Sequence, residues 1–151
     1  MKLSALYQIF LDCQSVTTDS RNCPDGSLFI ALKGESFNGN AFAKLALDSG
    51  CAFAIIDEIQ YAVEDDQRYI LVDDCLQTMQ QLANYHRRQL GTRVIGITGT
   101  NGKTTTKELI SSVLCQAHNV LYTLGNLNNH IGVPTTLRRL KPEHSRAGIQ
   151  R

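Results

Sequence analysis

The sequence predicts an α/β protein in two parts: a small α/β domain over residues 1–90, then the first part of a parallel α/β domain over residues 91–151. Short apolar stretches alternate with segments of helical periodicity, a pattern that favours parallel sheets. A glycine-rich stretch, GITGTNGKTTTKEL (Gly96–Leu109), stands between an apolar run and a helix-like continuation. The charge balance also changes, from 7 Lys and Arg against 12 Asp and Glu in residues 1–90 to 8 against 2 in residues 91–151. The second part therefore either meets an anion or lacks the acidic remainder of its domain.

The composition excludes several classes of protein. With 42% hydrophobic residues among 151, the chain suits a globular fold, and its apolar runs are too short and too often interrupted by charge to cross a membrane. The N-terminus lacks the features of a secretory signal, so we expect a cytoplasmic protein. Five cysteines without metal-ligand spacing indicate reduced thiols. Basic residues neither cluster on one expected helix nor alternate with aromatics, which argues against nucleic acid as a partner.

The first domain begins with a helix and a buried strand. Four apolar side chains recur at the spacing of one helix face: Leu3, Leu6, Tyr7 and Phe10. A turn at Pro24-Asp25-Gly26 then precedes the apolar run 28–32, which predicts a short strand.

The middle of the first domain continues this alternation. Residues 41–48 are predicted to be helical, and Gly50 supplies the stop. The apolar runs 51–57 and 69–72 predict two further strands, and the acidic segment 58–68 between them is most simply a solvated loop.

A longer helix is expected to join the two domains. Asp73 or Asp74 can cap it, apolar side chains recur along one of its faces as far as Leu90, and Gly91 ends it.

The second domain is predicted to start as strand, helix, strand, helix. The strand at 93–98 leads through the glycine loop to a helix from Lys103 to about residue 117, then to a strand at 119–123 and a helix at 135–140. These elements predict a parallel sheet of two strands that lacks a neighbour on at least one side.

The glycine loop predicts a phosphate site. Unpaired amides at a helix start and the helix macrodipole favour an anion, and Gly99 and Gly102 let the main chain approach it closely. Lys103 can reach the terminal phosphates, and the Thr104 hydroxyl is placed to bind Mg²⁺. The strict P-loop spacing requires glycine where Ile97 stands, so an ordinary turn before a helix is the alternative.

The loop TGTNGKTT at residues 98–105 resembles the ATP loop of the Mur ligases and of the related folylpolyglutamate synthetases. These enzymes use ATP to activate a carboxylate as an acyl phosphate, which an amine then attacks. The resemblance implies catalytic roles for Lys103 and Thr104, with Thr104 also binding Mg²⁺. It implies that ATP is bound by Gly99, Thr100, Asn101, Gly102, Lys103, Thr104 and Thr105.

Further stretches narrow the resemblance to the MurF branch of the Mur ligase family. The stretches TDSR (18–21) and PDGSLFIALKGE (24–35) are similar to the N-terminal signature of the MurE and MurF ligases, and GNLNNHIGVP (125–134) is similar to a block of MurF. The pair Lys107-Glu108 also fits MurF better than MurE, and we expect Glu108 to cap or pair. The resemblance implies an enzyme that uses ATP and Mg²⁺ to add D-alanyl-D-alanine to UDP-N-acetylmuramoyl-tripeptide.

A second set of residues is expected to hold the UDP-sugar peptide. The resemblance assigns this role to Ser20, Arg21, Lys33, Gly34, Asn126, Asn128 and Asn129. Each has a structural alternative. Ser20 and Arg21 would also suit a turn and a surface salt bridge, and asparagines tolerate left-handed turns. Lys33-Gly34 and the stretch 37–40 form a glycine-containing loop that could lie over the sugar nucleotide or simply cap the next helix.

The end of the chain departs from the family pattern. A glutamate metal ligand, a histidine, a carbamylated lysine and a C-terminal domain are expected beyond Arg151, while the polar segment 145–151 reads like a truncation or an altered reading frame. We therefore expect weak ligand binding and no ligase turnover by this chain alone. A MurE-type ligase, a non-catalytic UDP-sugar-binding module and a regulatory nucleotide switch are the competing hypotheses, and the oligomeric state is left open.

Overall fold

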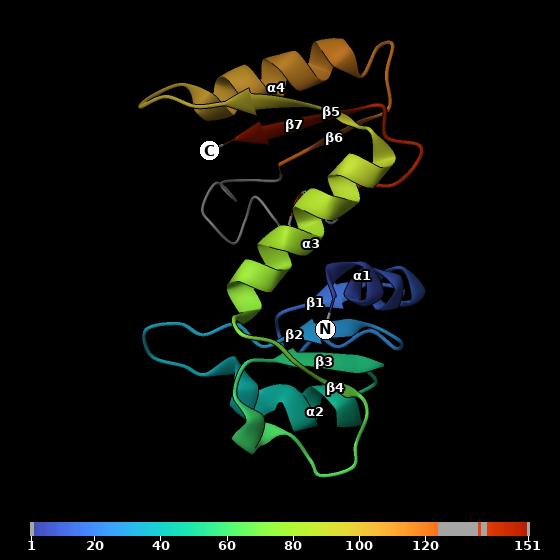
Figure 1. Cartoon of the computed structure of the whole chain (residues 1–151). Coiled ribbons are helices and arrows are strands. Elements are labelled where there is room, and N and C mark those ends of the chain that lie inside the picture. Colours follow the sequence, from blue (N-terminus) through green and yellow to red (C-terminus); the bar gives the residue numbers. More distant parts are fainter. Residues whose placement is uncertain (1, 124–135, 137–138, 151) are drawn as a thin grey trace. The chain divides into compact units, whose positions relative to one another are not determined.

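The computed structural model describes residues 2–123, 136 and 139–150, and the chain divides into two compact units (Figure 1). The first unit is Met1–Gln81 and the second is Leu82–Arg151. The division falls inside helix α3 (Cys75–Leu90). A domain boundary at residue 90 stays a prediction, but the α/β class with parallel sheets is confirmed.

The first unit contains a sheet of four parallel strands in chain order. They are β1 (Val16–Thr17), β2 (Leu28–Ile30), β3 (Phe53–Ile56) and β4 (Tyr69–Leu71). Strand β2 has all three residues buried, as a parallel strand covered on both faces requires. The strands β2, β3 and β4 confirm the three predicted runs, and the two-residue β1 was not predicted.

Helices cover both faces of this sheet (Figure 1). The elements are α1 (Leu3–Asp12), the 3₁₀ turn η1 (Gly39–Phe42), α2 (Ala43–Asp48) and the 3₁₀ turn η2 (Ile59–Tyr61). Helix α1 buries Leu6, Tyr7 and Phe10, which confirms the apolar face predicted from their spacing. Figure 1 shows α1 on one side of the sheet and α2 on the other.

Helix α3 begins and ends as its sequence predicts. The Asp74 carboxylate accepts a hydrogen bond from the Gln77 N–H at 2.7 Å, so Asp74 is the cap. The Asp57 carboxylate accepts a second one from the Cys75 N–H at 3.2 Å. After the helix, Gly91 adopts a φ of 63°, a conformation that glycine reaches at little cost.

The second unit contains a parallel sheet of three strands, so the prediction of two strands was wrong. Its elements are β5 (Arg93–Ile97), α4 (Lys103–Leu114), β6 (Val120–Tyr122) and β7 (Arg146–Gln150), with the strand order β5-β7-β6. The polar segment at the end of the chain thus supplies the central strand. Ala147 pairs with Val94 on one side and with Leu121 on the other. Strand β7 lacks the apolar run from which the other strands were predicted. It contains the small residues Ala147 and Gly148, and it is hydrogen-bonded to a neighbouring strand on each side.

The core of the second unit is small. Leu121, Leu140 and Ala147 are buried together, and Leu90 and Val94 pack against them. The buried His86 adds a 2.8 Å contact between its Nε2 and the Leu140 carbonyl. Of the helix predicted at 135–140, residues 135, 137 and 138 lie outside the described residues, and Arg139 and Leu140 are not helical. Among the described helices, none is long and apolar enough to span a membrane.

Candidate functional site

The glycine loop lies between β5 and α4, where the main chain adopts conformations suited to glycine. Gly99 has a φ of 144° and Gly102 a φ of 77°. A Cβ at Gly102 would meet nothing within 4 Å, so backbone conformation and not lack of space requires glycine there. Gly102 is also the N-cap of α4, with no side-chain capping hydrogen bond. The loop therefore joins the carboxyl end of β5 to the N-terminus of α4, whose first N–H groups are not capped by a side chain.

Lys103 folds back over this loop. Its Nζ donates a hydrogen bond to the Gly99 carbonyl, which places the ammonium group above the bend. Thr100, Asn101, Thr104 and Thr105 are exposed around it. The backbone bond from the Thr106 N–H to the Gly102 carbonyl, at 2.9 Å, is the first of the helical ladder, so the three N–H groups before it belong to the helix start. The structure thus brings all seven predicted ATP-binding residues into one accessible bend.

Lys107, one turn further along α4, has a structural role that the sequence did not reveal. Its side chain is 1% exposed, and its Nζ donates a 2.7 Å hydrogen bond to the carbonyl of Thr123, the residue just after β6. The same group lies 3.0 Å from Glu108 Oε1 and 5.9 Å from the centre of the Tyr122 ring. Glu108 therefore pairs, as predicted. Lys107 ties the beginning of α4 to the carboxyl end of β6.

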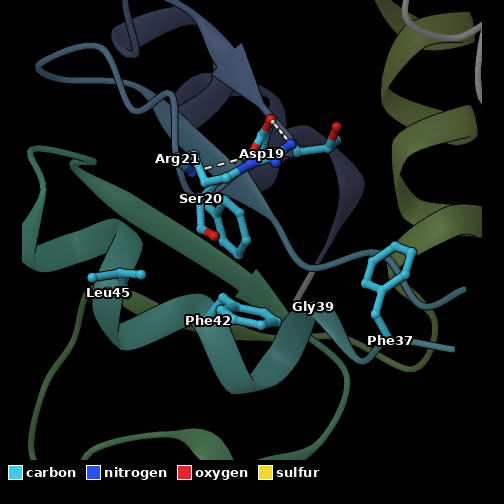
Figure 2. Close-up of a pocket in the computed structure, with 9 residues that line it drawn as sticks. Asp19, Ser20, Arg21, Phe37, Gly39, Phe42 and Leu45 are labelled. Carbon is cyan, nitrogen blue, oxygen red and sulfur yellow. Dashed lines mark hydrogen bonds and ion pairs between the residues drawn. The ribbon is translucent and has the colours of Figure 1, made fainter.

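A second candidate site is a pocket of about 520 Å³ within the first unit (Figure 2). Its lining combines a polar loop after β1 with side chains of β2, η1 and α2. The lining residues are Thr18, Asp19, Ser20, Arg21, Phe29, Phe37, Gly39, Phe42 and Leu45. Polar groups at one rim and aromatic rings on the remaining wall suit a ligand with both a charged and a planar part.

The polar rim is stabilised by its own hydrogen bonds. The Thr17 hydroxyl donates to the Asn22 carbonyl at 2.9 Å, which closes the loop. The Asp19 carboxylate accepts from the Arg21 guanidinium at 2.9 and 2.8 Å and from the Arg21 N–H at 3.0 Å. These hydrogen bonds lower the pKa of Asp19 to about 2. Arg21 therefore does form a surface salt bridge, and it also lines the pocket beside Ser20 (Figure 2).

Two other predicted residues, Lys33 and Gly34, are not among those that line this pocket. The Lys33 Nζ lies 2.9 Å from Glu58 Oε1 and 3.0 Å from Asp57 Oδ1, and these hydrogen bonds raise the pKa of Lys33. Gly34 lies under the ring of Phe37, where an added Cβ would overlap the ring. The remaining predicted contacts, Asn126, Asn128 and Asn129, lie outside the described residues.

Of the aromatic wall of the pocket, the sequence analysis named only the loop that carries Phe37 and missed Phe29 and Phe42. Phe29 is 1% exposed and belongs to the core, whereas Phe37 and Phe42 are 54% and 43% exposed. Two exposed phenylalanines that face one pocket are a stronger sign of a ligand than scattered ones. The sequence does contain a hint of this wall: two phenylalanines, Phe37 and Phe42, stand on either side of Gly39 in an otherwise mostly polar stretch.

The comparisons with known proteins decide the family. The model described as "Mur ligase family, catalytic domain" matches residues 12–87, which is half of the chain, and the "Mur ligase middle domain" matches residues 97–149. The chain belongs to the Mur ligase family. Its two units thus carry two successive parts of a Mur ligase.

Relatives within this Mur ligase family point to one branch. The chain is 45% identical over 134 residues to the UDP-N-acetylmuramoyl-tripeptide--D-alanyl-D-alanine ligase of Bacillus subtilis, and the match covers 89% of this chain and 29% of the relative. A crystal structure of MurF from Acinetobacter baumannii superposes with a TM-score of 0.86 at 34% identity, covering 99% of this chain and 35% of that one. The MurF ligase of Thermotoga maritima, solved in complex with ADP, superposes with a TM-score of 0.82 at 29% identity. That match covers 93% of this chain and 32% of the other. The chain thus spans about three tenths of the length of these ligases.

Proposed function

We propose that this chain is the front part of an ATP-dependent amide ligase of the MurF type. The reaction would add D-alanyl-D-alanine to UDP-N-acetylmuramoyl-tripeptide through an acyl phosphate, a step of peptidoglycan precursor synthesis. The observation that carries the proposal is the bend from Gly99 to Thr104, which is accessible, opens onto a helix N-terminus and carries Lys103 above it. A cytoplasmic location stays a prediction.

The bend would hold the polyphosphate of ATP. Main-chain N–H groups at the start of α4 would donate to phosphate oxygens, and the Lys103 ammonium would exchange its contact with the Gly99 carbonyl for a terminal phosphate. Thr104 is exposed at the second residue of the helix, and its hydroxyl is an oxygen ligand of the kind that Mg²⁺ prefers. When bound, Mg²⁺ would neutralise charge that builds up between the carboxylate and the phosphate.

The pocket of the first unit would hold the UDP-sugar. Arg21 and Ser20 at the polar rim would donate to the diphosphate or to the uracil edge, while Phe37 and Phe42 offer flat surfaces for the base. All nine lining residues come from the first unit. The second candidate function is therefore binding of the sugar nucleotide without catalysis. Binding without ligase turnover is what we expect of these 151 residues by themselves.

Separate titrations of the two ligands test the proposal. UDP-muramoyl-tripeptide and ATP with Mg²⁺ are each titrated into the chain by calorimetry, together with the variants Lys103→Ala and Arg21→Ala. We expect the lysine variant to lose ATP binding alone and the arginine variant to weaken UDP-muramoyl-tripeptide binding alone. A wild-type chain that binds neither ligand would contradict the proposal. Release of ADP in the presence of both substrates would contradict the expectation of no turnover.

A further inference from the structure

The turn between β2 and η1 places Phe37 at the rim of the pocket. Lys33 and Asn38 form an antiparallel bridge at its two ends, and the Gly34 N–H donates to the Phe37 carbonyl at 3.0 Å. Within this turn, the ring of Phe37 lies against Gly34, because an added Cβ there would overlap its Cε1. The place of the ring is therefore set by the conformation of the whole turn.

One carboxylate closes the two ends of this turn. The Oε1 of Glu58 accepts a hydrogen bond from the Lys33 Nζ at 2.9 Å, and its Oε2 accepts another from the Asn38 Nδ2 at 3.1 Å. Glu58 follows β3 and therefore belongs to a different segment of the chain. Gln60 also donates to Oε2, at 2.9 Å, which helps to fix the carboxylate. The Lys33 and Asn38 bonds lower the pKa of Glu58, so the clamp is charged at neutral pH.

A second set of contacts holds the turn at its base. The Asn40 Nδ2 donates to Asp57 Oδ1 at 2.8 Å, and the Asp57 N–H donates to Asn40 Oδ1 at 3.0 Å. Lys33 reaches the same Asp57 oxygen. Loss of Glu58 would remove the link between the Lys33 and Asn38 side chains and so loosen the turn, while the contacts of Asn40 and Lys33 with Asp57 keep its attachment to the sheet in place.

We propose that Glu58 is a positioning residue for the sugar-nucleotide pocket: it clamps the 33–38 turn and so holds the Phe37 ring where the planar base of the ligand stacks. The inference rests on the proposed function of the pocket and adds a residue that does not touch the ligand. It also gives Lys33 a role in the clamp. Base stacking on an aromatic ring is lost when the ring is displaced, which corresponds to roughly tenfold weaker binding.

A single tryptophan reports on this arrangement. The chain contains no Trp, so Phe37→Trp introduces one fluorophore at the rim of the pocket. UDP is titrated into the Phe37→Trp protein and into the same protein with Glu58→Ala, while Trp emission is followed. Glu58→Gln keeps an oxygen for Lys33 but presents an amide to Asn38, so it should have a smaller effect. Asp66→Ala is the matched control, because it removes a partly buried carboxylate that, like Glu58, pairs with a cationic side chain, here Arg68, elsewhere in the same unit.

We expect UDP to quench the tryptophan emission of the Phe37→Trp protein. Glu58→Ala in that protein should raise the UDP concentration at the midpoint of the titration about tenfold. Without UDP, acrylamide quenching of the same fluorophore should increase in Glu58→Ala and remain unchanged in Asp66→Ala. This second measurement separates release of the turn from general destabilisation. Should Glu58→Ala fail to fold, Gly34→Ala displaces the ring directly while leaving the clamp intact, and it should raise the midpoint for UDP as well.

The outcomes separate this inference from the proposed function. If calorimetry shows that wild-type protein does not bind UDP, the pocket assignment fails and the inference fails with it. If wild type binds UDP but Glu58→Ala and Gly34→Ala leave both the midpoint and the acrylamide quenching unchanged, only the clamp is refuted.

Discussion

The two candidate sites of this member of the Mur ligase family are built in different ways. The bend at residues 99–105 is made by seven consecutive residues, and its chemistry comes from main-chain N–H groups and one lysine. The pocket of the first unit is made by side chains from several separate segments around a buried parallel sheet. A site made by backbone conformation depends on local dihedral angles, whereas a site made by packing depends on the core beneath it.

The strands under the two sites show the same contrast. Leu28, Phe29 and Ile30 of β2 are at most 1% exposed, while Val94, Ile95 and Ile97 of β5 are only partly buried. We therefore expect substitutions at the pocket to change stability and binding together. Substitutions in the bend should change binding more than stability.

The largest expected effect comes from glycine to alanine in the first unit. A Cβ at Gly39 would overlap the carbonyl oxygen of Leu32 and crowd the backbone of Ala31, neither of which can move without disturbing β2. We expect Gly39→Ala to lower the free energy of unfolding by about 2–3 kcal/mol, by overpacking. Urea unfolding measures this change. Unchanged stability together with normal UDP binding would show that the pocket does not depend on this packing.

The same substitution in the bend should act through a different cause. A Cβ at Gly99 would have open space, with Asn101 O as the nearest atom at 3.9 Å, but the φ of 144° is strained for any residue with a side chain. We expect Gly99→Ala to weaken ATP binding about tenfold, for a conformational cost of order 1–2 kcal/mol. UDP affinity should stay as in the wild type, and the free energy of unfolding should fall by less than in Gly39→Ala, because the added Cβ has open space around it. A loss of stability equal to that of Gly39→Ala would remove the contrast between the sites.

Lys107 tests how much one buried hydrogen bond between α4 and the segment after β6 stabilises the second unit. Replacement by methionine keeps the apolar stem but leaves the Thr123 carbonyl without its 2.7 Å hydrogen bond. We expect the second unit to lose about 1–2 kcal/mol of stability, measured by denaturant unfolding. Glu108→Gln is the control, since it removes only an exposed partner of the lysine. If both variants behave alike, the buried hydrogen bond contributes nothing of its own.

The smallest effect concerns the polar rim of the pocket. The folded pKa of Asp19 lies near 2, below its ordinary value of 3.8, because Arg21 donates to its carboxylate. Because the pKa is lowered in the folded state, the Asp19–Arg21 pair contributes fully to the free energy of unfolding above about pH 4. This contribution is lost as the pH falls through about 2. Carboxyl carbon NMR should record that low pKa in the wild type. In Arg21→Ala it should return toward the ordinary value, and a value unchanged by the substitution would refute the pairing.

The sequence predicted what local patterns encode. The glycine loop, its helix and the caps of α3 were all predicted from short stretches, because a few neighbouring residues determine their conformation. Strand β7 was missed, since a central strand built around Ala147 and Gly148 takes its stability from two neighbours and not from its own hydrophobicity. The contact of Glu58 with Lys33 and Asn38 joins separate segments and became visible only in the fold.

Mapping backbone amides by NMR tests the central claim most directly. The ¹⁵N-labelled chain is titrated with ATP and Mg²⁺, and the shift of each amide is followed. We predict the largest shifts at Gly99–Thr105 and none beyond noise at Ser20 and Arg21, which should respond to UDP instead. Unmoved amides in the bend at saturating ATP would contradict the account, as would shifts concentrated anywhere else in the chain.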